Sequence, residues 1–296
     1  MELLPTILNL GVTVFAASSM LAVGFQYRLR DVLSPLRDIP GLITAIIANF
    51  VLVPLLAIGI LQLVRLDRAM SIGMILVACA AGAAMLVKLA TNAGEDAAFA
   101  AAILVLLLVG TIVYMPLVTP LLAEGGDVNA WAIARPLVLT MLLPLVAGFV
   151  IRSYLPGLSA ASLPYLGILI NVSLVVMVLL VLYLNFGSVI GVFGTGAILA
   201  GLLLIGGSFA IGYLIGTFDP TEKTVLGFAT AQRNFAAANV VAIQSFTDPG
   251  VLVMTVVISV VALLLIPISW AYGKRRAKGI DARGAKFEAK KGAGPV

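Results

Sequence analysis

The chain has 296 residues, of which 62% are hydrophobic and 10% are charged. Soluble domains carry about 25% charged residues, so this composition leaves too few polar side chains to cover a globule and argues against a soluble enzyme. With no histidine and a single cysteine, the chain also lacks the usual transition-metal ligand sets and any disulfide framework. We expect a polytopic helical membrane protein that is not an enzyme and needs no cofactor.

Nine apolar segments follow one another along the chain, each close to the roughly 20 residues that a spanning helix needs. Only short connections separate them, so no separate soluble domain is expected. The sequence therefore predicts an all-α polytopic membrane protein with nine transmembrane helices. The segments cover residues 5–25, 41–63, 69–94, 97–122, 131–151, 162–185, 196–217, 223–246 and 250–272.

The charges predict the orientation of these helices. Residues 1–273 hold ten Lys and Arg against eleven Asp and Glu, whereas the C-terminal tail, 273–296, holds eight bases and two acids. Because basic loops stay on the cytoplasmic side, this tail and the three arginines between residues 26 and 40 predict an outside N-terminus and a cytoplasmic C-terminus. We expect the chain to lie in a plasma or inner membrane, with the tail against anionic lipid and no nucleic-acid partner.

Two segments resemble each other in composition. Residues 81–88 read AGAAMLVK and residues 229–238 read ATAQRNFAAA, and both stretches are rich in small residues and carry one cation. If the halves are inverted repeats, residues 1–122 form the first, with a broken crossing helix at about 69–94, and residues 131–272 form the second, with its crossing helix at about 223–246. Transporters often hold their substrate at such a pair of interrupted helices.

Arg233 is the most unusual residue of the chain. It lies eleven residues after Glu222 in an apolar segment, about 16 Å from the nearer helix end, and a cation at that depth costs several kcal/mol unless it has a partner or faces a wet cavity. No carboxylate lies within any apolar segment. Arg233 could bond to backbone carbonyls of a broken helix, but the favoured hypothesis is that it anchors an anion, since a guanidinium matches a carboxylate.

Other polar residues lie near Arg233 or at similar depth. Gln232, Arg233 and Asn234 cannot share one face of an intact helix, because consecutive residues diverge by about 100°, so we predict a locally unwound backbone. Asn49 is a buried amide that could contact substrate or bond between helices, and Lys88 could face a cavity or extend to the membrane interface. The candidate substrate-binding residues are Arg233, Asn234, Gln232, Thr230, Asn49 and Lys88.

Three stretches resemble the bile acid:sodium symporter family. Residues 222–224 (EKT), followed eight positions later by Gln232, look like one crossing helix of that family; residues 75–82 (ILVACAAG) look like the segment entering the other. Asn49-Phe50 with Pro54 is similar to the family's amide-Phe-x-x-x-Pro helix. The resemblance implies a core of six helices and a smaller panel, two broken crossing helices and alternating access, in the nine-span form.

The chain departs from the family at the residues that bind sodium there. The family's glutamate four positions before the Gln corresponds to Phe228, and the asparagine after that Gln corresponds to Arg233. A sodium ion about 5 Å from a guanidinium is repelled by roughly 3 kcal/mol even at an effective dielectric of 20. These differences argue against sodium at these positions.

The favoured function is a secondary transporter of a small organic anion by alternating access, sodium-independent, with Arg233 as the mid-membrane anchor. One alternative is a sodium-coupled symporter of organic anions or bile acids, as the resemblance implies. The other is a membrane ligand sensor that does not transport. The expected partners are a small organic anion and the lipid bilayer, with no obligate protein partner.

Overall fold

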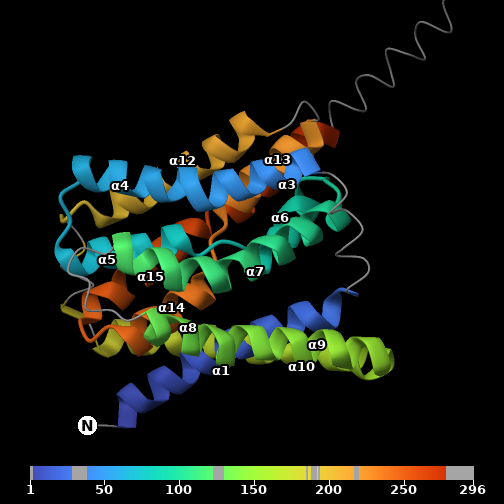
Figure 1. The fold of residues 1–296 in the computed structure, drawn as a ribbon, viewed down its shortest axis with the longest axis horizontal. Helices are drawn as coiled ribbons and strands as arrows, with labels where there is room; N and C mark the ends of the chain where they lie inside the picture. The colour runs from blue at the N-terminus through green and yellow to red at the C-terminus, as the bar shows by residue number, and fades with distance from the viewer. Residues whose placement is uncertain are drawn as a thin grey trace, which may run out of the picture.

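The computed structural model describes residues 3–28, 39–122, 130–184, 186–187, 192, 194–216 and 220–277, and the described chain is built from helices (Figure 1). Two of the elements, η2 and η3, are single π-helical turns inside longer helices. The elements are α1 (Leu3–Gln26), α3 (Ile39–Ile47), η2 (Ala48–Leu52), α4 (Val53–Leu63), α5 (Arg68–Cys79), α6 (Met85–Asn92), α7 (Ala97–Leu122), α8 (Ala130–Leu137), η3 (Val138–Leu142), α9 (Leu143–Tyr154), α10 (Pro156–Leu184), α12 (Ala197–Ile215), α13 (Pro220–Ala231), α14 (Phe235–Ser245) and α15 (Pro249–Ala262).

Seven helical stretches of the described chain are long and apolar enough to cross a membrane, which makes this a polytopic membrane protein. Each coincides with one of the predicted apolar segments. The other two predicted segments, 69–94 and 223–246, are the pairs α5–α6 and α13–α14, each interrupted near its middle. The seven stretches are Leu3–Gln26, Pro40–Leu63, Ala97–Leu122, Ala130–Tyr154, Pro156–Leu184, Ala197–Ile215 and Pro249–Ala277.

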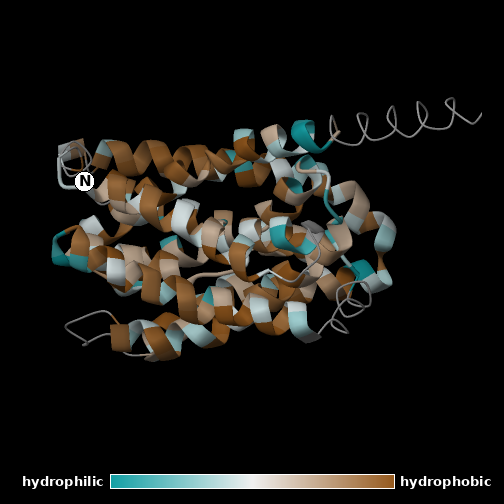
Figure 2. Cartoon of the chain, turned by 90° about the horizontal axis from the view of Figure 1, so that it is seen from above, coloured by the Kyte–Doolittle hydropathy of each residue, from teal (hydrophilic) through white to brown (hydrophobic). Residues whose placement is uncertain are grey.

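The outer surface of the bundle is apolar over most of its length. Figure 2 shows hydrophobic residues along the helices and most hydrophilic residues gathered toward the two ends. Large apolar side chains point outward from several helices, among them Leu55, Leu117 and Ile168, which are 57%, 62% and 62% exposed. A continuous apolar exterior of this kind suits lipid contact and would be a liability in water.

The helices fall into two packed groups. α1 lies against α9 and α10 and touches η3, and these elements form the lower layer in Figure 1 together with α8. The larger group contains α3 to α7 and α12 to α15, in which α12 packs on α13, α4 and α15, and α15 packs on α5. The groups meet mainly where α14 lies against α1 and α8, and where α7 lies against α8.

Prolines explain the two π-helical turns. Pro54 and Pro144 each follow a π turn by two residues, and proline has no N–H to donate to the carbonyl four residues before it. For Pro54 that carbonyl belongs to Phe50, and it instead accepts the hydroxyl of Tyr114 on α7 at 2.5 Å. The Phe50 carbonyl is therefore paired with a neighbouring helix. The same π turn holds Asn49, which is fully buried.

The C-terminal end of the described chain packs against the turn between α6 and α7. The helix that follows α15 continues to Ala277, and its Arg276 forms an ion pair with the buried carboxylate of Glu95. Gly273 lies so close to α6 that an added Cβ would come within 2.2 Å of the Asn92 carbonyl oxygen. Most of the predicted basic tail, 273–296, lies outside the described residues.

Candidate functional site

The first interrupted helix breaks after Cys79. Residues 80–83 are not helical, and Gly82 has a φ of +75°, a conformation that favours glycine. A Cβ at Gly82 would also lie 2.4 Å from the backbone nitrogen of Leu108 on α7. The hydroxyl of Thr111 accepts from the Ala81 N–H at 2.8 Å and donates to the Ala81 carbonyl at 2.9 Å. The break is therefore held in place by α7.

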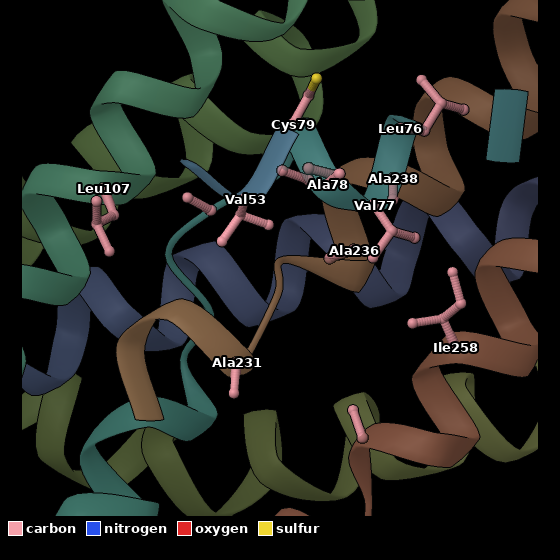
Figure 3. Close-up of a cluster of buried hydrophobic side chains, with 14 of the residues drawn as sticks. Val53, Leu76, Val77, Ala78, Cys79, Leu107, Ala231, Ala236, Ala238 and Ile258 are labelled. Atoms are coloured by element: carbon pink, nitrogen blue, oxygen red, sulfur yellow. The ribbon is translucent and has the colours of Figure 1, made fainter. Parts of the chain in front are cut away.

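The second interrupted helix breaks at Gln232–Asn234, as the three consecutive polar residues predict. Figure 3 shows the extended stretch of chain between Ala231, at the end of α13, and Ala236, in α14. The Asn234 side-chain oxygen accepts from the Ala237 N–H at 3.1 Å and so caps the start of α14. The backbone N–H of Asn234 donates to the Ala80 carbonyl oxygen at 2.9 Å. The two breaks therefore touch each other.

Arg233 lies where the breaks meet, with 0% of its surface exposed. A guanidinium has five N–H donors, and here five acceptor contacts surround them. Nε donates to the Val77 carbonyl at 3.2 Å, and Nη2 donates to the carbonyls of Ala78 at 2.5 Å and Asn49 at 3.5 Å. Nη1 donates to the Asn49 side-chain oxygen at 2.6 Å and to the Thr230 carbonyl at 3.2 Å.

The helix ends explain why a cation is stable at this position. Val77 and Ala78 lie in the last turn of α5, and Thr230 lies in the last turn of α13. Carbonyls in a last turn lack N–H partners four residues further along the helix and carry the negative end of the helix dipole; the Val77 carbonyl also accepts the Ala80 N–H at 3.1 Å. The side chain of Asn49 is fixed in the orientation that Arg233 needs, because its amide nitrogen donates to the Ala45 carbonyl at 3.0 Å, which leaves its oxygen to accept.

Five of the six predicted site residues lie at the contact between the two breaks: Arg233, Asn49, Thr230, Asn234 and, beside them, Gln232. Arg233, Asn49 and Thr230 form one hydrogen-bonded cluster, and Asn234 joins it through the backbone at Ala80. Gln232 is 9% exposed, and its side chain makes no hydrogen bond to any residue that the structure describes. Asn234 is 2% exposed, and its buried Nδ2 likewise has no partner within the described chain. These two amides therefore have donors that a ligand could use.

Lys88 is the predicted site residue that the structure leaves apart. It lies on the exposed face of α6, beyond the first break, while its neighbours Leu86, Val87 and Leu89 are buried. It is therefore not part of the buried cluster around Arg233.

Three buried polar residues near the crossing were not among the predicted site residues. Thr111 clamps the first break, as described above. The hydroxyl of Thr255 on α15 donates to the side-chain oxygen of Asn239 on α14 at 2.6 Å, and the Asn239 amide lies 3.6 Å from the sulfur of Met177 on α10. Asn239 could have been found as Asn49 was, as an isolated amide in an apolar segment. Threonines give no such signal, because they are common in spanning helices.

Comparison with known proteins identifies the group to which this crossing belongs. The model of the sodium bile acid symporter family matches residues 13–192, more than half of the chain. The chain belongs to this family. The family resemblance expected from residues 49–54, 75–82 and 222–232 is thereby confirmed, and the family is one of transporters, not of enzymes.

Two relatives come from Arabidopsis thaliana. Over 269 residues the chain is 25% identical to a probable sodium/metabolite cotransporter, BASS5, chloroplastic, which covers 84% of this chain and 65% of the relative. Over 196 residues it is 24% identical to a probable sodium/metabolite cotransporter, BASS3, chloroplastic, covering 66% of this chain and 45% of the relative. The matches to these members of the family span less than two thirds of the relatives' own length.

Proposed function

We propose that the protein is a secondary transporter that moves a small organic anion across a membrane by alternating access. The observation that supports this most directly is the contact between the two helix breaks, where the Asn234 N–H bonds to the Ala80 carbonyl beside a fully buried Arg233. Non-helical backbone at membrane depth occurs only where it is buried in protein or lines a water-filled cavity, and transporters form substrate sites from such interrupted helices. Membership of a symporter family agrees with this function.

The side-chain N–H donors that have no partner in the described chain favour an anionic substrate. The amide of Gln232, the Nδ2 of Asn234 and the start of α14 all lie at the second break, and a helix N-terminus favours negative charge. The guanidinium of Arg233 adds a positive charge to the same region without being exposed itself. A small carboxylate fits these groups, so we assign substrate contact to Gln232 and Asn234. In the described conformation Arg233 would act on the anion through its field, while Asn49 and Thr230 hold Arg233.

The division into two groups of helices supports alternating access. α1, α8, α9 and α10 would move as one body against the remaining helices, and the crossing would change its exposure from one side of the membrane to the other. We further propose nine spans, repeats at residues 1–122 and 131–272, an outside N-terminus and a cytoplasmic C-terminus. Labelling of single cysteines placed at residues 3 and 277 from either side of the membrane tests this orientation.

Uptake into proteoliposomes tests the transport function. The purified protein should accumulate at least one radiolabelled small carboxylate, such as a keto acid, and Gln232→Ala should reduce the initial rate about tenfold, the loss expected for one hydrogen bond to a charged group. Gln62→Ala removes an exposed amide on α4 and is the matched control. If a folded protein takes up no carboxylate in sodium or potassium medium, the proposal is wrong.

A second candidate is sodium-coupled symport, which is favoured by the relatives named as probable sodium/metabolite cotransporters. It predicts that the same uptake falls to background when potassium replaces sodium. Sodium-independent uptake would contradict it.

A further inference from the structure

We infer that the guanidinium of Arg233 is a tethered cation that takes the place of a coupling sodium ion at the crossing. The inference rests on the proposed function for its meaning in transport. The cation cage, meaning the oxygens that surround the Arg233 guanidinium, can be tested without any substrate.

The oxygens around Arg233 form the kind of set that binds a bare cation. They come from three segments far apart in the sequence: Asn49 of η2, the carbonyls of Val77 and Ala78 at the end of α5, and the carbonyl of Thr230 near the end of α13. Four of the five acceptors are backbone oxygens, and two helix dipoles end at the site. Figure 3 shows that the side chains of Val77 and Ala78 themselves belong to a buried hydrophobic cluster. Hard monovalent and divalent cations prefer oxygen ligands of this type.

The residues present do not fit a sodium ion beside this guanidinium. Every donor of Arg233 already points at one of these oxygens, so an added ion would share its ligands with a fixed positive charge at short range. The charge that would offset such repulsion is missing, since within the described residues no carboxylate pairs with Arg233. Phe228, one turn before the break, instead packs edge-on against Phe209 with ring centroids 5.2 Å apart.

A tethered cation changes the energetics of transport. It is part of the protein in every conformation, so it cannot carry energy from a sodium gradient. The substrate would therefore move down its own electrochemical gradient or exchange against another anion, and the charge carried per substrate would be that of the anion alone.

Thermal melting of the detergent-purified protein tests the cage. The wild type should melt at the same temperature in sodium chloride and potassium chloride at equal ionic strength. Arg233→Ala empties the cage and should melt several degrees lower, and guanidinium or methylguanidinium at millimolar concentration should restore part of that loss, since a ligand well above its Kd raises the melting temperature by a few degrees. The wild type and Arg135→Ala, which removes an exposed arginine of α8, should show no such rise.

Two further variants keep the test decisive if Arg233→Ala does not fold. Arg233→Lys keeps the positive charge and Arg233→Met keeps the length without it, so the lysine variant should melt higher. A sodium-specific stabilisation of the wild type would overturn the inference, as would equal melting of the lysine and methionine variants or the absence of guanidinium rescue in a folded Arg233→Ala. If the cage behaves as expected but no carboxylate is taken up, the proposed function fails and the cage stands.

Discussion

Asn49 and Arg233 lie 184 positions apart in the sequence, and their side chains meet at 2.6 Å in the interior of the protein. The amide oxygen of Asn49 faces the guanidinium because its nitrogen is engaged by the Ala45 carbonyl. This pair joins the π-helical turn η2 to the second helix break. It makes the position of a buried charge depend on a proline-induced irregularity in another helix.

Replacing Asn49 should destabilise the protein strongly. Asn49→Ala removes the one side-chain acceptor of Arg233 and leaves a charged donor buried without a partner, which costs about 1.5–3 kcal/mol. Urea or SDS titration of the purified protein measures this loss. Asn92→Ala is the matched control, because its amide makes only a long bond of 3.4 Å to Ser269 and does not contact Arg233. Equal effects of the two variants would contradict the role assigned to Asn49.

Gly82→Ala should prevent correct folding. Its φ of +75° and the backbone nitrogen that lies 2.4 Å from an added Cβ leave no room for a side chain, so the cost exceeds the roughly 1–3 kcal/mol of backbone strain alone. We expect loss of the monodisperse protein peak in size-exclusion chromatography. Gly167→Ala, in α10 with nothing within 4 Å of the added Cβ, should leave that peak intact. A well-behaved Gly82→Ala protein would show that the first break has a different conformation.

Thr111→Val should loosen the first break without changing its shape. The substitution keeps the volume but removes the hydroxyl that both donates to and accepts from Ala81, at an expected cost of about 1–3 kcal/mol. Hydrogen exchange at residues 80–84, followed by mass spectrometry, should become faster. Thr140→Val is the comparison, since its hydroxyl bonds only to Pro136 within the same helix. Unchanged exchange at residues 80–84 would argue that α7 does not hold the break.

Two substitutions of Asn234 should separate its role in capping α14 from a role in binding substrate. Asn234→Ser retains an oxygen that can cap α14, so the melting temperature should change little, whereas Asn234→Ala should lose about 0.5–2 kcal/mol of stability. Both variants remove the unpartnered Nδ2, so both should raise the KM for a carboxylate by about tenfold. If the serine variant transports with the wild-type KM, the amide nitrogen does not contact substrate.

The electrical behaviour of uptake should report what accompanies the anion. With a tethered cation, an inside-positive potential should speed uptake into proteoliposomes, because only the negative substrate crosses. One sodium ion per monoanion would make uptake insensitive to potential, and more than one would reverse the sign. Initial rates measured at imposed potassium diffusion potentials of either polarity distinguish these cases.

Much of this architecture could be predicted from the sequence. Seven of the nine predicted apolar segments are helices long enough to span a membrane within the described residues, because a bilayer fixes their length. Three adjacent polar residues at 232–234 mark a break, because they cannot share a helical face. For Arg233 the sequence offered bonding to the backbone carbonyls of a broken helix as one alternative, and the structure shows such bonds. Which carbonyls they are could not be predicted. Four of the five acceptor contacts of Arg233 are backbone oxygens, which every residue possesses and no side-chain pattern reveals.

The same limitation applies to Thr111 and Lys88. The clamp of Thr111 on Ala81 depends on which helix packs against the break, information that a single sequence does not contain. Lys88 lies one helical turn past the break, and the sequence left open whether it faces a cavity or extends to the membrane interface. The burial of Leu86, Val87 and Leu89 leaves Lys88 on the exposed face of α6, and the sequence alone did not show which face that would be.

The predominance of backbone acceptors around Arg233 also bears on how such a protein can change over evolution. Substitutions at Val77, Ala78 or Thr230 that preserve the helix ends leave the oxygens in place, so the ligand shell tolerates sequence drift. The cation that these oxygens surround, by contrast, is the side chain of one residue, Arg233. A lineage could exchange an ion supplied by the medium for one encoded in the gene by a few side-chain replacements, here Arg233 and Phe228, while the backbone oxygens stay where they are.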